Sequence, residues 1–578
     1  MKPVIYQLFV RLFGNKTENV RLNGTKKENG CGKFDDISAV ALDSLRSFGI
    51  SHVWYTGILE HAVATDYSEF GIEPDFPEIV KGRAGSPYAI KDYYDVDPDL
   101  ANNVPGRMKE FEKLVNRTHA AGMKVIIDFV PNHLARVYKS DMKPATEIAD
   151  FGATDKTTVA FSSENDFYYL PGQQLRLPDD ILEKGIMNEY RKTPRAYIES
   201  PARATGNDCF SASPGSGDWY ETVKLNYGVD YFTDGKLQIT DIPLLWNKMR
   251  SVILYWAGKN IDGFRTDMAE MVPVEFWEWL IRSVKKEFPD LVFIAEIYKP
   301  DMYRTFIERC GFDYLYDKMD FYDGVRNVVE QKSGTGVITR CWQKTGDLER
   351  FMLRFMENHD EQRIASEYFA GEPWKGIPAM VLAATMNNGP VMIYFGQESG
   401  EPAKGESGFS GDDGRTTIFD YWNVPCHQKW MNNGKFDGNA LPSGLSLLRY
   451  EYSKLLRLVN EYPVFSNGAF YDLMWVNQET FSHSKGKIYS YLRYNEEWAA
   501  LIIINFGNCL LGDSRVLIPE DAFMAIKSGK KAFEGKFNAG KRLDFSPEGG
   551  TEAMYDKDHG YVKMDLPPLS STVFLCKL

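Results

Sequence analysis

The sequence predicts an α/β fold in which parallel strands alternate with helices, followed by an antiparallel β domain. Up to about residue 462, short apolar stretches that end in polar residues alternate with stretches of helical periodicity. After about Pro463 the pattern becomes that of closely spaced apolar strands, which continue to Val573-Phe574-Leu575. Strands that alternate with helices are typical of a parallel sheet, and closely spaced strands are typical of an antiparallel sandwich.

The first elements follow this alternation. Apolar runs predict strands at residues 4–10, 52–56 and 125–130, and helical spacing predicts helices over 37–48 and 108–121. The first helix carries Ile37, Val40, Ala41, Leu45 and Phe48 at helical spacing. Gly49 and Gly122 follow the two helices, which suits a helix C-terminus.

Residues 134–240 interrupt the alternation, which then resumes. The segment is rich in Asp, Pro, Ser and Gly, and it is too long for a loop, so it predicts an inserted domain. Further strands are predicted at 263–267, 291–295, 312–316, 352–356 and 391–395, with a helix over 275–288. The expected domains are a barrel built from residues 1–133 and 241–462, the insertion at 134–240, and a β-sandwich at 463–578.

Composition excludes several classes of protein. The chain of 578 residues has a net charge of -13, and a nucleic-acid binder would carry a basic face instead. No apolar run is long enough to span a membrane. Seven scattered cysteines without a CxxC pair argue against a disulfide framework or a zinc site. With no secretory signal pattern at the N-terminus, a cytoplasmic location is expected.

Candidate catalytic residues stand where predicted strands end. In Gly263-Phe264-Arg265-Thr266-Asp267, Arg265 and Asp267 share one face of a strand, and the guanidinium favours the ionised carboxylate. A structural ion pair would give the same pattern. The stretches at 128–133, 293–296 and 355–360 also end in carboxylates or histidines. Polar residues gathered at the carboxyl ends of parallel strands are typical of a (β/α)8 barrel active site.

In this order, the four stretches resemble the motifs of the α-amylase superfamily of retaining glycoside hydrolases, glycoside hydrolase family 13. The resemblance implies a (β/α)8 TIM barrel with a domain inserted after the third strand. It also implies a role for each matching residue. Asp267 would be the nucleophile, Glu296 the general acid/base and Asp360 the third carboxylate, while His133, His359, Arg265 and Tyr88 would bind the sugar. The apolar residues before Glu296 are expected to help it hold its proton.

The resemblance requires no cofactor but leaves a structural calcium ion open. Asn132 matches a calcium ligand of many members, and it is the only such ligand that the sequence indicates. An asparagine that ties down its own loop is the alternative. Many members of the superfamily carry a Lys-His pair shortly after the nucleophile, and Glu270 and Met271 stand at these two positions here. Contacts to the leaving part of the sugar chain must therefore differ.

The expected function is cleavage of α-1,4-glucosidic bonds in starch, glycogen or maltooligosaccharides. A 4-α-glucanotransferase or another transglycosylase would use the same residues, so the sequence leaves this alternative open. An α-glucosidase is another alternative, but Gly85 stands where α-glucosidases of the family usually carry Asp, which weakens this interpretation. A non-catalytic relative is disfavoured because all three carboxylates are present. The oligomeric state is not readable from the sequence.

Overall fold

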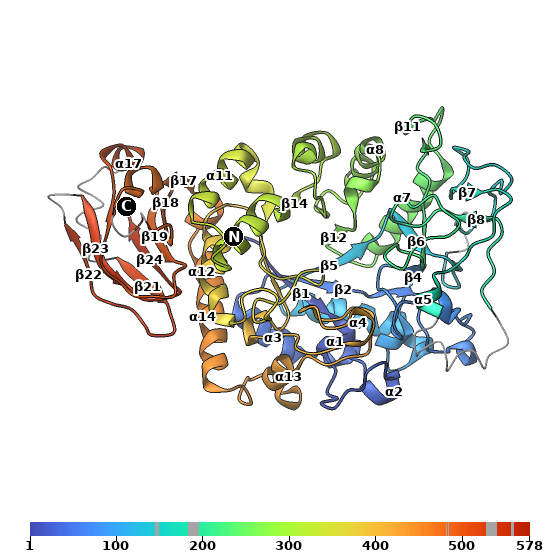
Figure 1. Cartoon of the computed structure of the whole chain (residues 1–578), viewed down its shortest axis with the longest axis horizontal. Helices are drawn as coiled ribbons and strands as arrows, with labels where there is room; N and C mark the ends of the chain where they lie inside the picture. The colour runs from blue at the N-terminus through green and yellow to red at the C-terminus, as the bar shows by residue number, and fades with distance from the viewer. Residues whose placement is uncertain (145–148, 183–195, 481–482, 484, 527–539, 557–559) are drawn as a thin grey trace.

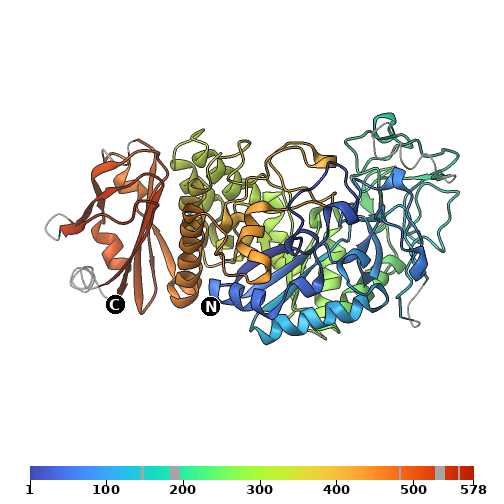
Figure 2. The same cartoon turned by 90° about the horizontal axis from the view of Figure 1, so that it is seen from below.

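The computed structural model describes residues 1–578 except 145–148, 183–195, 481–482, 484, 527–539 and 557–559. The molecule is elongated. A parallel barrel lies in the middle, the C-terminal β domain lies at one end, and the segment that contains β7, β8 and β11 lies at the other (Figures 1 and 2). The first strand of the chain is one of the barrel strands and lies between the second and the last of them.

Eight parallel strands form the barrel, in the order β15-β14-β13-β12-β5-β2-β1-β16. Their bounds are β1 Val4–Phe9, β2 His52–Thr56, β5 Lys124–Phe129, β12 Gly263–Thr266, β13 Val292–Ala295, β14 Tyr314–Tyr316, β15 Met352–Leu353 and β16 Val391–Tyr394. A parallel bridge between Arg354 and Val391 joins the two ends of this order, so the sheet closes. The fold class predicted from the sequence is confirmed.

Helices cover the outside of the barrel. The main ones are α3 Ala39–Phe48, α4 Arg107–Ala120, α7 Leu244–Ala257, α8 Val274–Lys285, α11 Gly336–Thr345, α12 Gly376–Thr385 and α14 Ser443–Glu461. Helix α8 buries Phe276, Leu280 and Val284 on one face. Each buried side chain of this size contributes about 1.5–3 kcal/mol. Ser38 caps α3 at its start, and Gly49 ends it in the left-handed conformation that the sequence predicted.

Some sequence-based boundaries were too wide. The strand expected at 312–316 begins two residues later, as β14. The strand expected at 352–356 is reduced to β15, because the chain then enters the loop that carries His359 and Asp360. Val40, which was assigned to the apolar face of its helix, is 54% exposed. The side chain faces solvent at this position of the helix. Hydrophobic spacing alone does not say which apolar residues of a helix are buried.

The segment after β5 contains short antiparallel pairs instead of barrel strands. These are β6 His133–Ala135 with β9 Thr222–Lys224, β7 Tyr169–Leu170 with β8 Ala202–Arg203, and β10 Val229–Asp230 with β11 Lys236–Leu237. Before it, the antiparallel pair β3 Leu59–His61 and β4 Ile90–Val96 rises from the end of β2. The two regions together stand above one side of the barrel.

The C-terminal domain consists of a five-stranded sheet and a three-stranded sheet. The first has the order β17 Ala469–Asp472, β18 Ile488–Tyr494, β19 Trp498–Asn505, β24 Ser570–Lys577 and β21 Lys541–Phe545. The second has the order β20 Leu511–Leu517, β23 Tyr561–Leu566 and β22 Ala553–Asp556. A separate apolar core lies between them. The domain is not entirely β, because it also contains the short helices α15 Val464–Asn467, α16 Met474–Asn477 and α17 Glu520–Ala525.

Two expectations from composition can be compared with the described residues. All seven cysteines fall in these residues, and each is a free thiol. In the same part of the chain, every helix is too short or too polar to pass through a bilayer.

Candidate active site

A cavity of about 360 Å³ opens at the carboxyl ends of the barrel strands. Five of the residues predicted from the sequence line it: Tyr88, His133, Asp267, Glu296 and Asp360. Arg265 is fully buried beneath it, and His359 is almost fully buried. These residues come from four different strand ends and from the loop before β4, so the closed barrel brings together parts of the chain up to 272 positions apart (88 to 360).

Arg265 connects the carboxylates. It donates a hydrogen bond of 2.8 Å to Asp267 Oδ1, and it forms an ion pair of 2.7 Å with Glu296 Oε2. A third carboxylate, Asp128, lies 3.5 Å from the same guanidinium. Asp267 and Glu296 come directly after the paired residues Thr266 and Ala295 of β12 and β13. The two acids therefore project side by side from neighbouring strands, which lie roughly 4.8 Å apart.

Aromatic rings enclose the guanidinium and keep water away from it. The rings of Trp54, Tyr88 and Tyr316 lie 5.3, 5.4 and 5.6 Å from the Arg265 carbon, within cation–π range. Low polarity around the group strengthens its attraction for both acids. The arginine is held in a single position by strand, carboxylates and rings, so it fixes the geometry of the two acids.

The electrostatics of the acid pair differ from what the sequence indicated. Burial and the nearby Glu296 raise the pKa of Asp267 well above its usual value, although Arg265 opposes the shift. Glu296 is not held in apolar surroundings as expected, because donors face both of its oxygens. Tyr298 donates to Oε1 at 2.5 Å, and the Met268 N–H donates to Oε2 at 2.8 Å. The Arg265 guanidinium thus faces both acids with one positive charge.

Asp360 and His359 face the cavity from the loop after β15. Desolvation acts to raise the pKa of Asp360, but His359, 3.0 Å away, lowers it to about 2, so this acid is ionised throughout the neutral range. The Nε2 atom of His359 also lies 2.6 Å from the Tyr88 hydroxyl, and its Nδ1 atom lies 2.7 Å from the Gln7 amide. Tyr88 stacks on His359 at 5.2 Å between ring centres.

His133 lines the cavity, and its neighbour Asn132 is buried behind it. Burial lowers the pKa of His133 to about 3, so its imidazole is neutral and able to donate one hydrogen bond to a sugar hydroxyl. Asn132 donates to the Gly206 carbonyl at 2.7 Å, and its side-chain oxygen accepts a hydrogen bond from the ammonium group of Lys224. Lys224 also pairs with Asp208 at 2.7 Å. Because a lysine supplies the positive charge at Asn132, these surroundings do not fit a calcium ion.

Several cavity residues were missed from the sequence. Tyr298 contacts the proposed acid directly, and Trp219 of the inserted segment lies 5.1 Å from the His133 ring. An ion pair of 3.0 Å between Lys81 and Glu221 joins two loops at the cavity wall. Tyr298 was within reach of sequence reasoning, because it lies two residues after Glu296. The other three come from loops whose course only the folded chain determines.

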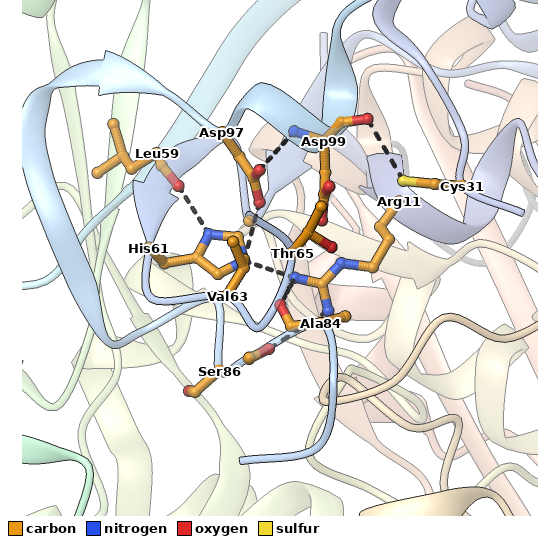
Figure 3. A network of polar contacts seen from close by, with 12 residues as sticks. Arg11, Cys31, Leu59, His61, Val63, Thr65, Ala84, Ser86, Asp97 and Asp99 are labelled. Atoms are coloured by element: carbon orange, nitrogen blue, oxygen red, sulfur yellow. Dashed lines mark hydrogen bonds and ion pairs between the residues drawn. The ribbon is translucent and has the colours of Figure 1, made fainter. Parts of the chain in front are cut away.

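A buried polar network fixes the loop that carries Tyr88 (Figure 3). Arg11 donates to the carbonyls of Ala84 at 2.7 Å and Ile418 at 2.9 Å, so it joins the loop before β4 to the loop after β16. Its guanidinium also contacts His61, whose Nε2 atom lies 2.9 Å from Asp97 Oδ2. The side chains of this network do not line the cavity. They hold in place the loops that form its wall.

Two acids on neighbouring strand ends, with a third acid across the cavity, define a glycoside hydrolase of the barrel class. The alpha-amylase catalytic domain model matches residues 21–416. The chain therefore belongs to the α-amylase family, glycoside hydrolase family 13, and is an enzyme of α-amylase type.

Individual relatives are distant. "Alpha-amylase 3" of Dictyoglomus thermophilum is 21% identical over 492 residues, which cover 80% of this chain and 78% of the relative. An alpha-1,4-glucan:maltose-1-phosphate maltosyltransferase of Picrophilus torridus is 24% identical over 280 residues, 48% of this chain and 39% of the relative. The structure of the maltogenic alpha-amylase AmyB from Thermotoga neapolitana has a TM-score of 0.56 at 19% identity, with coverage of 100% and 99%. These structural likenesses support the fold.

Proposed function

We propose that the protein is a retaining glycoside hydrolase that cleaves α-1,4-glucosidic bonds in α-glucans or maltooligosaccharides by double displacement. One observation carries the proposal: Asp267 and Glu296 project from adjacent strands into the same cavity and bind the same guanidinium. Retaining enzymes place their two carboxyl groups about 5–5.5 Å apart, which neighbouring strands allow.

In the first step, an oxygen of Asp267 attacks the anomeric carbon of the sugar. The bond from this carbon to the leaving oxygen breaks, and Glu296 gives its proton to that oxygen, so a glycosyl ester and a shortened glucan result. Oε2 faces Arg265 and the Met268 N–H, so Oε1 is left to carry the proton. The Tyr298 hydroxyl, which donates to Oε1 of the ionised acid, can accept a hydrogen bond from this oxygen once it is protonated. Asp360, ionised in the neutral range, stabilises the positive charge that develops on the sugar ring.

In the second step, Glu296 acts as a base. It takes a proton from water, and the water oxygen attacks the anomeric carbon and releases Asp267. The two displacements add one water across one glycosidic bond and return both acids to their starting states. Tyr88 and His133, which both line the cavity, would hold the ring that is cleaved.

Proton NMR of the first product from maltooligosaccharides tests this proposal. The α-anomer should accumulate first and convert to the mixture by mutarotation. Early β-anomer would overturn double displacement. Chromatography of products from starch, maltotriose, pullulan and trehalose would then define the bond and chain length that the enzyme accepts.

A 4-α-glucanotransferase is the second candidate. Its support is that a maltosyltransferase stands among the relatives and that the same two acids serve both reactions. A sugar hydroxyl would replace water in the second step. At high maltotriose concentration a transferase should form products longer than the substrate, whereas a hydrolase should form mainly shorter ones.

A further inference from the structure

Four carboxylates meet outside the cavity, where β3 and β4 adjoin the inserted segment. Glu60 of β3, Asp92 and Asp95 of β4, and Asp141 each place one oxygen so that all four oxygens lie within 4.8 Å of one another. Glu60 and Asp92 are directly paired across the two antiparallel strands. Like charges in such a pair destabilise a sheet, so the arrangement calls either for neutral acids or for a compensating cation.

The protein itself supplies little of that positive charge. Arg107 pairs with Asp95 and lies 3.5 Å from Asp141. In the described part of the chain, neither Glu60 nor Asp92 has an ion-pair partner. Lys91 of β4 pairs with Asp75 at 3.1 Å, and its charge also acts on Glu60, where it lowers the pKa against the effect of burial.

Glu60 is the second, separate sign of a missing ligand. Its side chain is only 3% exposed, it is aimed into the group of acids, and its Oε2 atom has no hydrogen-bond partner among the described residues. A buried carboxylate oxygen without a partner is costly, and proteins usually satisfy such groups by pairing or by binding a metal. Its neighbour His61 points to the opposite side of β3, into the network of Arg11 and Asp97 (Figure 3).

We propose that Glu60, Asp92, Asp95 and Asp141 form a binding site for one divalent cation of the calcium type. Calcium takes carboxylate oxygens at 2.3–2.6 Å, so ligands on opposite sides of the ion lie up to about 5 Å apart, which matches the spacing here. Magnesium binds at about 2.0–2.1 Å and requires a tighter shell. This site is separate from Asn132, where Lys224 supplies the charge.

Burial disfavours the charged forms of three of these acids. Burial raises the pKa of Asp92 to about 7 and that of Asp95 to about 6, and it raises the pKa of Glu60 well above its usual value. Without a cation, the fold therefore opposes ionisation of three neighbouring acids. A bound divalent ion reverses this local preference by favouring the ionised form.

Occupation of the site would join two parts of the active-site wall. Asp92 already accepts hydrogen bonds from the Ser140 hydroxyl at 2.8 Å and the Asp141 N–H at 3.1 Å, at the start of the inserted segment. Strand β4 begins two residues after Tyr88. A cation shared by the strand and the insertion would therefore stabilise the backbone on which this ring depends.

Terbium luminescence and thermal unfolding test the site without an activity assay. After chelation, the full chain should bind one terbium ion that calcium displaces, and calcium should raise the melting temperature more than magnesium does at equal concentration. Glu60→Gln and the more exposed Asp141→Asn should each weaken binding at least about tenfold, since fewer charged ligands remain. Metal-free Glu60→Gln should melt no lower than the metal-free wild type, because it replaces a buried acid whose charged form the fold disfavours.

Two control variants locate the ion. Glu451→Gln removes a buried carboxylate far along the chain, one that pairs with Lys454, and Asn132→Ala removes the other calcium candidate. Both should keep the calcium response. Absence of terbium binding and of a calcium-dependent shift in the wild type would overturn the proposal. A response that Asn132→Ala abolishes and the variants at 60 and 141 retain would overturn it as well.

Discussion

The hydroxyl of Tyr298 is expected to control protonation of the leaving group. It lies 2.5 Å from Oε1 of Glu296, the oxygen that carries the catalytic proton in the proposed mechanism. Hydrogen bonds to charged groups contribute about 1.5–3 kcal/mol. Loss of this bond in Tyr298→Phe should therefore reduce kcat/KM on maltooligosaccharides by about 10- to 150-fold, since each 1.36 kcal/mol corresponds to a factor of ten.

A comparison of two substrates distinguishes an effect of Tyr298→Phe on protonation of the leaving group from an effect on substrate binding. An α-maltosyl fluoride leaves without a proton, so its first-step rate should fall much less in Tyr298→Phe than the rate on maltooligosaccharides. Tyr316→Phe is the matched control, because its hydroxyl lies 3.3 Å from Arg265 Nε and does not contact Glu296. This control should affect both substrates to a similar extent.

Initial rates of fluoride release and of reducing-end formation, at equal enzyme concentration, measure both effects. If Tyr298→Phe slowed both substrates equally, the tyrosine would act on binding or on Asp267, and the assigned role would fail. An unchanged rate on maltooligosaccharides would show that the hydrogen bond contributes nothing to the transition state.

Three further predictions concern the acids and the loop that carries the stacking tyrosine. Glu296→Gln should lose at least about 10²- to 10⁴-fold on starch yet keep glycosylation by the fluoride, whereas Asp267→Asn should lose both; retained fluoride release in Asp267→Asn alone would reverse the two roles. Because the folded-state pKa of Asp267 is raised, ionisation of this acid reduces the stability of the fold as pH rises through that pKa. Asp267→Asn should therefore melt higher than the wild type at neutral pH and lose this advantage below about pH 4, the usual pKa of Asp. Calorimetry across this range would contradict the prediction if the difference in melting temperature did not change with pH. Gly85→Ala should lower the melting temperature and activity, since its backbone is left-handed with φ +70° and the new Cβ would lie 1.8 Å from the Ala62 carbonyl; Gly71→Ala, with φ +83° and open space, controls for backbone strain alone, and equal effects would rule out the clash.

Local patterns were sufficient for the barrel and for the principal site residues. Apolar strands that alternate with amphipathic helices leave few packings other than a closed parallel sheet, and its strand ends must meet on one side. The order of the four stretches then indicated Asp267 and Glu296, which follow β12 and β13 directly, and Asp360, which lies in the loop after β15. Boundaries were less certain where strands were short, as in β14 and β15, since tertiary hydrogen bonds and not local propensity decide where pairing stops.

The sequence by itself determined the fold class, and it predicted the three acids and the arginine as candidate site residues. Only the tertiary structure decided their electrostatic surroundings. It placed Tyr298 on Glu296, it gave the oxygen of Asn132 to Lys224, and it gathered Glu60 with Asp141 from positions 81 residues apart (60 to 141). Such contacts depend on loops that have no periodicity, so the chain's local pattern does not encode them. Burial and charge, which set the pKa values, exist only once these loops have packed.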